Sequence, residues 1–208
     1  MMANVPYTSS SERIVLVAAS ATPEQLQRFR AVTGTLGLAT SIGNSAGIFG
    51  WSDAAGDWVR PGLALYGVSP FADVRGAALG LKPVMTLESA IIGLRRVPRG
   101  ESVGYAAAWT AARDSRIAIV AGGYGDGMLR SLQDGSPVLI DGRRAPLVGR
   151  VSMDMIAVDV TDLPEPQVGT RCLLWGPGLP VEEVASHAGT ISYEMLCGVR
   201  QRVPHEAI

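Results

Sequence analysis

The hydrophobic pattern of this 208-residue chain changes at about Leu81, and that change limits the folds open to it. Before this point, strand-like apolar runs alternate with helical segments, as in parallel α/β sheets. Beyond it, short β-rich runs are separated by Gly, Pro and Asp clusters, a pattern typical of antiparallel sheets. We therefore expect an α/β part over residues 1–72, a connector that reaches residue 81, and a mostly antiparallel β domain over residues 82–208.

The first part contains one clear helix signal. Thr22 is a suitable N-cap, and Pro23 follows at the first helical position. Apolar residues then recur on one face at Leu26, Phe29, Val32 and Leu36. The apolar run Arg13–Ser20 predicts a buried strand before this helix, Gly37–Ser41 a short strand after it, and Asn44–Gly47 the start of a helical turn.

The second part has strand signals followed by two late helices. The predicted strands are Val84–Val97, Arg116–Val120, Pro137–Ile140, Met155–Val160 and Arg171–Trp175. Helices are expected over Pro180–Ala185 and from Ile191 to Leu196. The Asp-Gly pairs at 126–127, 134–135 and 141–142 have the composition of tight hairpin turns.

Charge and composition narrow the possible partners and the compartment. The chain is 47% hydrophobic and 18% charged, with a formal net charge of −1 and no basic block, so neither nucleic acid nor a membrane is an expected partner. No apolar run approaches the roughly 20 residues that cross a bilayer. Ile14–Ala21 resembles the apolar core of a signal peptide, but only Arg13 supplies positive charge before it, so we expect no cleaved signal and a cytoplasmic protein.

The cysteines and histidines do not suggest a metal or disulfide site. Cys172 and Cys197 cannot form a disulfide framework, and we expect both to be buried, reduced thiols. His187 and His205 lack partners at metal-ligand spacing, so we predict surface or capping roles for both and no metal centre.

Three short segments have the composition of site loops: Ser102–Tyr105, Gly123–Gly127 and Gly149–Asp154. In each, glycines and polar side chains stand where an apolar run ends or reverses. Loops on a rigid scaffold often carry function. Ordinary turns and the buried tyrosines of a β domain would explain the same spacing, and the residues alone leave both interpretations open.

With these segments the sequence closely resembles the C-terminal portion of the bacterial alanine racemase family. Six motifs carry the resemblance in order: Asn44–Gly47, Val59–Gly67, Ser102–Tyr105, Gly123–Gly127, Val148–Asp154 and Thr190–Glu194. Members are pyridoxal 5'-phosphate enzymes with a (β/α)8 barrel followed by a β domain. The resemblance, which we expect from about Thr22 onward, thus implies an α/β remnant of such a barrel ahead of the antiparallel domain.

The resemblance assigns cofactor-binding roles. It implies that the cofactor phosphate is bound by Ser45, Gly62, Leu63 and Tyr193. Backbone N–H groups and hydroxyls suit this role because they satisfy phosphate oxygens directionally. Arg60 would face the pyridine nitrogen, and its permanent charge would keep that nitrogen unprotonated, which limits side reactions.

The resemblance also implies the reaction. This is the interconversion of L-alanine and D-alanine, which supplies D-alanine for peptidoglycan. Racemisation needs two acid/base groups on opposite faces of the substrate, in this family a Schiff-base lysine and a tyrosine that corresponds to Tyr105. This tyrosine acts on the partner subunit's cofactor, so a homodimer is expected. The backbone N–H of Met153 would meet the substrate carboxylate, and Tyr124 and Asp154 would line the same entrance.

Several features depart from the family pattern. The only lysine is Lys82, which stands just after the connector and cannot take the role of the Schiff-base lysine. We therefore expect a partial racemase that is inactive alone, in which the first 20 residues do not match the family. Ser41 replaces a frequent histidine, and Gly125 replaces a frequent alanine.

Two alternatives stay open. The chain could be a non-catalytic β module for dimerisation or cofactor binding. It could also belong to a related amino-acid racemase or a fold-sharing decarboxylase, although the Tyr105 and Met153 motifs favour alanine racemase.

Overall fold

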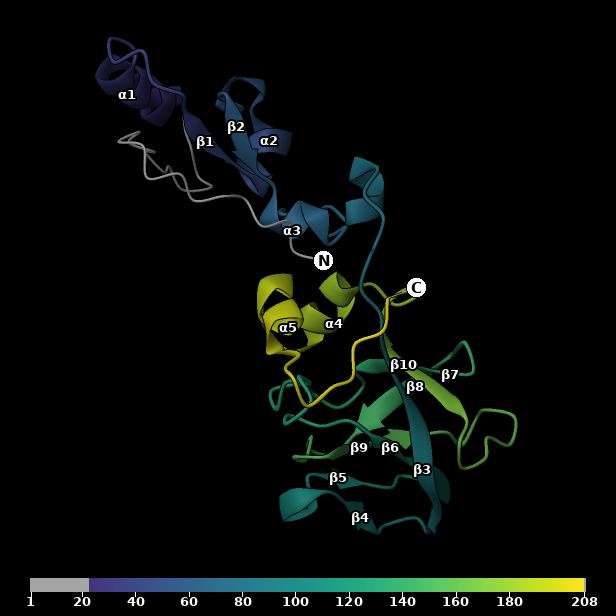
Figure 1. The fold of residues 1–208 in the computed structure, drawn as a ribbon. Helices are drawn as coiled ribbons and strands as arrows, with labels where there is room; N and C mark the ends of the chain where they lie inside the picture. The colour runs from purple at the N-terminus through teal and green to yellow at the C-terminus, as the bar shows by residue number, and fades with distance from the viewer. Residues whose placement is uncertain (1–22, 208) are drawn as a thin grey trace. The chain divides into compact units, whose positions relative to one another are not determined.

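A computed structural model describes residues 23–207 of the chain (Figure 1). The predicted strand Arg13–Ser20, the signal-like segment Ile14–Ala21 and the Thr22 cap lie outside the described residues. The chain divides into two compact units, Met1–Leu81 and Lys82–Ile208.

The first unit alternates helices and short strands. Its elements are α1 (Pro23–Thr33), β1 (Ser41–Asn44), α2 (Ser45–Gly50), η1 (Ser52–Ala54), β2 (Trp58–Arg60), α3 (Gly62–Leu65) and η2 (Gly76–Leu79). The two strands pair in parallel, with Ser41 opposite Trp58 and Asn44 opposite Arg60. Parallel pairing agrees with the predicted alternation. Two strands do not make a barrel, so a barrel origin of this unit stays a prediction.

Helix α1 packs through fewer residues than its sequence predicts. Leu26 and Phe29 are buried against Ile42 and Ala54, but Val32 is 69% exposed. The helix ends at Thr33, so Leu36, three residues later and 52% exposed, does not continue the apolar face. The extent predicted for that face is therefore wrong.

The short strand after α1 also begins later than predicted. Gly37 has φ +60°, which belongs to the left-handed region and not to an extended strand. Strand β1 instead starts at Ser41, where side chains become buried. The prediction of a strand over Gly37–Ser41 is wrong because the left-handed backbone at Gly37 makes a turn there.

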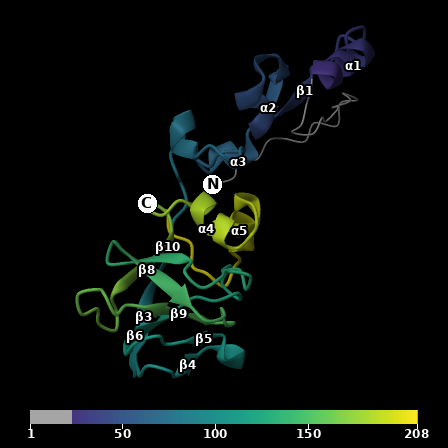
Figure 2. The same cartoon turned by 180° about the vertical axis from the view of Figure 1, so that it is seen from behind.

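The second unit is built around a closed antiparallel barrel (Figures 1 and 2). Its strands are β3 (Leu87–Val97), β4 (Ser102–Val103), β5 (Trp109–Thr110), β6 (Ser115–Ala121), β7 (Pro137–Ile140), β8 (Arg143–Val148), β9 (Met155–Asp159) and β10 (Arg171–Trp175). Its helices are η3 (Tyr105–Ala107), α4 (Val181–His187) and α5 (Ser192–Gly198). Six strands close in the order β10-β3-β6-β9-β8-β7, which removes free edges. The predicted antiparallel β domain is confirmed.

Strand β8 was not predicted, because Pro146 and two arginines mask its pattern. Pro146 lies opposite Pro137 at the end of the β7–β8 pair. The turn between these strands has positive φ at both Asp141 (46°) and Gly142 (74°), as a type I′ hairpin turn requires. The Asp-Gly pairs at 126–127 and 134–135 lie in the connection between β6 and β7, which are not neighbours in the barrel. The hairpin prediction therefore holds only at 141–142.

The core of the second unit is apolar and almost completely enclosed. Its largest fully buried side chains include Trp175, Ile117, Ile140, Leu147 and Met195. Each such side chain contributes on the order of 1.5–3 kcal/mol by leaving water. Helices α4 and α5 lie side by side at one end of the barrel (Figure 2). Cys172 is buried, but Cys197 on α5 is exposed, so the prediction of two buried thiols is wrong for Cys197.

Candidate functional site

The first unit brings four of the predicted site residues together. Ser45 is the first residue of α2 and only 1% exposed. Its Oγ accepts a hydrogen bond from the Ala64 N–H over 3.1 Å. Because Ala64 belongs to α3, this bond fixes the start of α2 beside the segment that carries Gly62 and Leu63.

Arg60 ends strand β2 next to the same segment. Its Nη1 donates to the Ser41 carbonyl over 2.9 Å and to the Ser41 Oγ over 2.8 Å. The opposite residue in the register is Asn44, whose Oδ1 accepts from the Gly47 N–H over 3.0 Å and caps α2. Asn44 thus has a structural role. The guanidinium of Arg60 carries five N–H donors, so these two bonds leave donors for a ligand.

The start of α3 offers donors for an anion. Within residues 23–207, neither the Gly62 N–H nor the Leu63 N–H has a protein acceptor. A Cβ built on Gly62 would meet no atom within 4 Å, so the space beside it is open. The Ser45 hydroxyl accepts from Ala64 and keeps its own proton for donation. These neutral donors next to a permanent cation fit the phosphate and ring nitrogen of pyridoxal phosphate.

In the second unit, Tyr105 is presented on a tightly held loop. Its side chain is 67% exposed. Gly104 before it has φ 85° and ψ 173°, a conformation available essentially only to glycine. A Cβ on Gly104 would lie 3.1 Å from the Arg150 nitrogen, so the Tyr105 loop lies directly on the segment that leads to Met153. Two further residues of the loop, Ala106 and Ala107, have positive φ of 58° and 50°.

Backbone hydrogen bonds join the segments of Tyr124, Met153 and Asp154. The Tyr124 N–H donates to Ser152 O and the Gly125 N–H to Met153 O, both over 2.9 Å. The Gly122 N–H donates to the Asp154 carbonyl over 2.8 Å. In the part of the chain that the structure describes, the Met153 N–H has no protein acceptor. That leaves it available to a substrate carboxylate.

Arg202 is a residue of this region that the sequence did not indicate. Its Nε lies 2.9 Å from Asp126 Oδ1, and its Nη2 bonds to Asp154 Oδ1. The hydrogen bond to Asp154 and the charge of Asp126 raise the pKa of Arg202 above its ordinary value. No motif includes Arg202, and it stands 48 residues from Asp154, so no local signal could have found it.

Tyr193 is the second residue of α5 and 42% exposed. An open hollow of about 420 Å³ in this unit is lined by Tyr124 and, from α5, by Glu194 and Cys197. The structure therefore groups Ser45, Arg60, Gly62 and Leu63 in the first unit. In the second unit it groups Tyr105, Tyr124, Met153 and Asp154, with Tyr193 on a helix of that unit.

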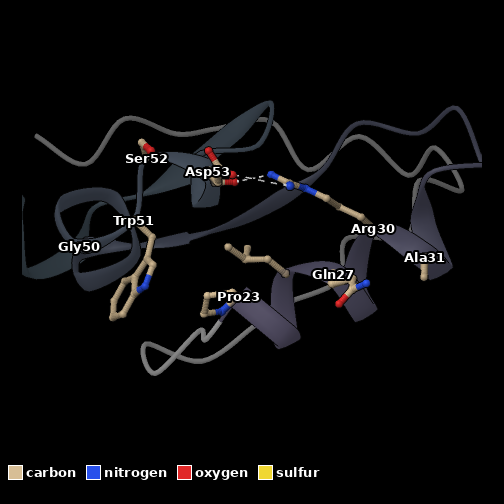
Figure 3. Close-up of a pocket in the computed structure, with 9 residues that line it drawn as sticks. Pro23, Gln27, Arg30, Ala31, Gly50, Trp51, Ser52 and Asp53 are labelled. Carbon is tan, nitrogen blue, oxygen red and sulfur yellow. Dashed lines mark hydrogen bonds and ion pairs between the residues drawn. The ribbon is translucent and has the colours of Figure 1, made fainter.

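A larger hollow of about 740 Å³ lies between α1 and the end of α2 (Figure 3). Arg30 and Asp53 cross it as an exposed ion pair, with Trp51 on one wall. None of the predicted site residues lines it. Its size alone therefore does not make it the candidate site.

Residues 23–207 contain no cluster of three His, Cys, Asp or Glu side chains arranged to hold a metal ion. Over the same residues, no helix is both long enough and apolar enough to cross a bilayer.

Comparison with protein families decides the relationship. Residues 84–207 match the family model "Alanine racemase, C-terminal domain", and residues 12–70 match "Alanine racemase, N-terminal domain". The chain belongs to the alanine racemase family. The match from residue 12 shows that our expectation of a resemblance only from about Thr22 is wrong.

Individual alanine racemases are similar over most of this chain. The alanine racemase of Chromohalobacter salexigens is 53% identical over 163 residues, 78% of this chain and 45% of the relative. That of Pseudomonas taetrolens is 45% identical over 207 residues, which cover 100% of this chain and 58% of the relative. The chain thus spans about half the length of the curated alanine racemases that it matches.

Solved alanine racemase structures have the same fold over the shared region. The biosynthetic alanine racemase of Pseudomonas aeruginosa is 49% identical, with a TM-score of 0.83 over 92% of this chain and 55% of that one. The alanine racemase of Bartonella henselae, solved with covalently bound pyridoxal phosphate, is 36% identical, with a TM-score of 0.80 over 91% of this chain and 54% of that one.

Proposed function

We propose that the whole protein interconverts L- and D-alanine with pyridoxal 5'-phosphate, as its relatives' names indicate. Residues 1–72 would be the C-terminal part of a β/α barrel, and residues 82–208 the family's β domain. The observation that carries the proposal is the backbone contact of the Tyr105 loop with the segment that leads to Met153, because it joins the loop of an exposed phenol to the segment of an unpartnered N–H. Supply of D-alanine to the cell wall and a cytoplasmic location are part of the same proposal.

The first unit would bind the cofactor. Ser45, Gly62 and Leu63 would donate to its phosphate, and Arg60 would donate to its ring nitrogen. The resemblance also gives Tyr193 the role of a phosphate ligand. Bound in this way, pyridoxal phosphate supplies the electron sink that acidifies the α-proton of an amino acid. Arg60 weakens that sink because a permanent cation keeps the ring nitrogen unprotonated, which favours simple proton return over side reactions.

Tyr105 would exchange a proton at the α-carbon of the substrate. Its phenol would take the proton from one face of the substrate or return it there, as a positioned acid/base. Its exposed position is compatible with transfer to a substrate held by another surface. We propose that this surface belongs to the partner subunit, so that each site of a homodimer is shared.

Met153 and its neighbours would orient the substrate. The Met153 N–H would bind the α-carboxylate, and Tyr124 and Asp154 would line the entrance on the same side. Lys82 stands just after the connector, whereas the family's Schiff-base lysine lies at the start of the barrel, so we do not assign it the role of the second base. That base would come from the half of the family's length that this chain does not span, and the 208-residue chain alone would then be inactive.

A fusion tests the proposal. The part of the Chromohalobacter salexigens alanine racemase that corresponds to the sequence before residue 22 is joined ahead of residue 22. Racemisation of L-alanine is then followed by chiral chromatography, with the unfused 208-residue chain as the control. Activity only in the fusion supports the proposal, whereas racemisation by the unfused chain contradicts the assignment of the second base.

The same assay separates the alternative functions. A fusion that racemises a larger amino acid in preference to alanine would indicate a related racemase. A fusion that binds pyridoxal phosphate and is inactive on every amino acid tested would indicate a non-catalytic module.

A further inference from the structure

Arg202 joins the two segments of the second unit that carry the substrate-side residues. Its guanidinium pairs with Asp126, next to the Tyr124 segment, and with Asp154, directly after Met153. Asp126 in turn accepts from the Gly123 N–H over 2.9 Å through its other oxygen, Oδ2. A planar fork of donors can hold two carboxylates in fixed positions, which a single ammonium group cannot do.

The Arg202 guanidinium lies in the space beside Gly125 that a side chain would otherwise occupy. A Cβ on Gly125 would lie 2.4 Å from the Arg202 Nη1 and 3.0 Å from the Met153 carbonyl. Gly125 does not have the positive φ that would itself require a glycine. The position therefore demands space rather than backbone freedom, and the atom that takes up the space is the end of Arg202.

The segment of Arg202 is also packed onto the Tyr124 segment. A Cβ on Gly127 would lie 2.9 Å from the backbone of Val199, so the chain after α5 passes directly over Gly127. Three residues later, Arg202 reaches the two aspartates. Helix α5, which carries Tyr193, is thereby connected to the segments of Tyr124 and Met153.

We propose that Arg202 is a positioning residue, which fixes the Met153 N–H relative to Tyr124 through Asp154 and Asp126 and whose guanidinium uses the space beside Gly125. The consequence for substrate rests on the proposed function. Arg202 contacts the carboxylates of Asp126 and Asp154. It would not touch the α-carbon of the substrate, so its loss should weaken substrate binding more than proton transfer. The Michaelis constant for alanine should rise roughly tenfold, with kcat changed much less.

Hydrogen exchange of the full 208-residue chain tests the structural step without activity. Arg202→Ala should speed exchange of the Tyr124 and Gly125 amides by about five- to tenfold, because their bonds to Ser152 and Met153 lose their clamp. Arg113→Ala is the matched control, because Arg113 forms a similar exposed pair with Asp162. That control should leave the two amides unchanged, and equal exchange in wild type and Arg202→Ala would overturn the proposal.

A double-mutant cycle tests the role of Gly125. Gly125→Ala should speed the same exchange by displacing the guanidinium, and should add little in an Arg202→Ala background. Fully additive effects would contradict the coupling. Arg202→Lys should restore only part of the protection, because it can pair with one aspartate at a time.

Kinetics of the fusion test the functional step. A rise in the Michaelis constant with kcat nearly unchanged in Arg202→Ala supports positioning of the substrate segment. A roughly tenfold fall in kcat with no change in the Michaelis constant would overturn the positioning role of Arg202. A fusion that is inactive with Arg202 intact would count against the proposed function instead, while the exchange results would still decide whether Arg202 holds the two segments together.

Discussion

Gly104 and Gly149 lie in backbone contact, so that a Cβ added to Gly104 would stand 3.3 Å from the Gly149 Cα. Both have positive φ, 85° and 72°. The contact sets the loop of Tyr105 on the segment that continues to Met153. Two glycines 45 residues apart in sequence thus hold the Tyr105 loop against the Met153 segment.

Gly104→Ala should destabilise the second unit and displace Tyr105. We expect a loss of about 1–3 kcal/mol in unfolding free energy, because φ 85° and ψ 173° are strained for alanine. Urea unfolding monitored by tryptophan fluorescence measures it. Gly100→Ala is the control, since Gly100 has φ 87° with no atom near its Cβ position. An equal loss of unfolding free energy in both variants would show that the contact with Gly149 adds nothing to the strain of a positive φ.

Tyr105→Phe should remove most of the activity of the fused racemase. The phenol is the proposed acid/base of one face, and a positioned acid/base is worth roughly 10²–10⁴-fold in rate. Initial rates of alanine racemisation in both directions provide the measurement. Tyr66→Phe, at an exposed tyrosine outside the proposed site, should stay close to wild type. Indifference to Tyr105→Phe would sink the assignment.

The two cysteines should differ in reactivity. Cys172 is completely buried, and burial raises the pKa of its thiol to about 12, so almost no thiolate forms near neutral pH. Cys197 is exposed on α5. Iodoacetamide at about pH 8 should therefore alkylate Cys197 alone in the native protein, and both cysteines in urea. Mass spectrometry locates the label, and native labelling of Cys172 would contradict the enclosed barrel core.

Asp57 should make the first unit sensitive to acid. Its Oδ2 accepts from the Thr40 N–H over 2.8 Å and from the Thr40 hydroxyl over 2.9 Å, and these bonds lower its pKa below the ordinary value of 3.8. Because the folded-state pKa is the lower one, the stabilisation is present above 3.8 and is lost as the pH falls through the folded-state value.

The protection factor of the Thr40 amide against hydrogen exchange, measured between about pH 2 and pH 5, checks this dependence. Asp57→Asn should remove most of the pH dependence of Thr40 protection. Asp73→Asn, at another exposed carboxylate of the unit, should keep it. A Thr40 protection factor that does not change with pH in the wild-type protein would contradict the role of Asp57.

Strands whose signal is a short, contiguous apolar run were predicted with the correct bounds. Pro137–Ile140 and Arg171–Trp175 have the predicted bounds, because each is a compact apolar run between turn residues. Strand β8 was missed because a proline and two arginines occupy positions that pairing with β7 tolerates. The predicted apolar face of α1 was too long, since Val32 and Leu36 stay exposed. Burial depends on what packs against a helix, which its own sequence does not show.

The candidate residues were recognised from motifs, and their grouping came from contacts between distant segments. The sequence indicated Tyr105, Tyr124 and Met153 through the residues on either side of each. It could not indicate Arg202, which stands in no motif and reaches Asp154 only after the chain has passed through α5.

The sequence by itself determined the division near Leu81, the antiparallel character of the second part and the family, because hydrophobic period and motif spacing are local properties of a chain. The tertiary structure alone decided the closure of the barrel through the pairing of β7 with β10, the contact of Gly104 with Gly149, and the clamp of Arg202 over Gly125. Each of these joins segments far apart in sequence. Their energy depends on register and on the space between backbones, and no local pattern encodes either.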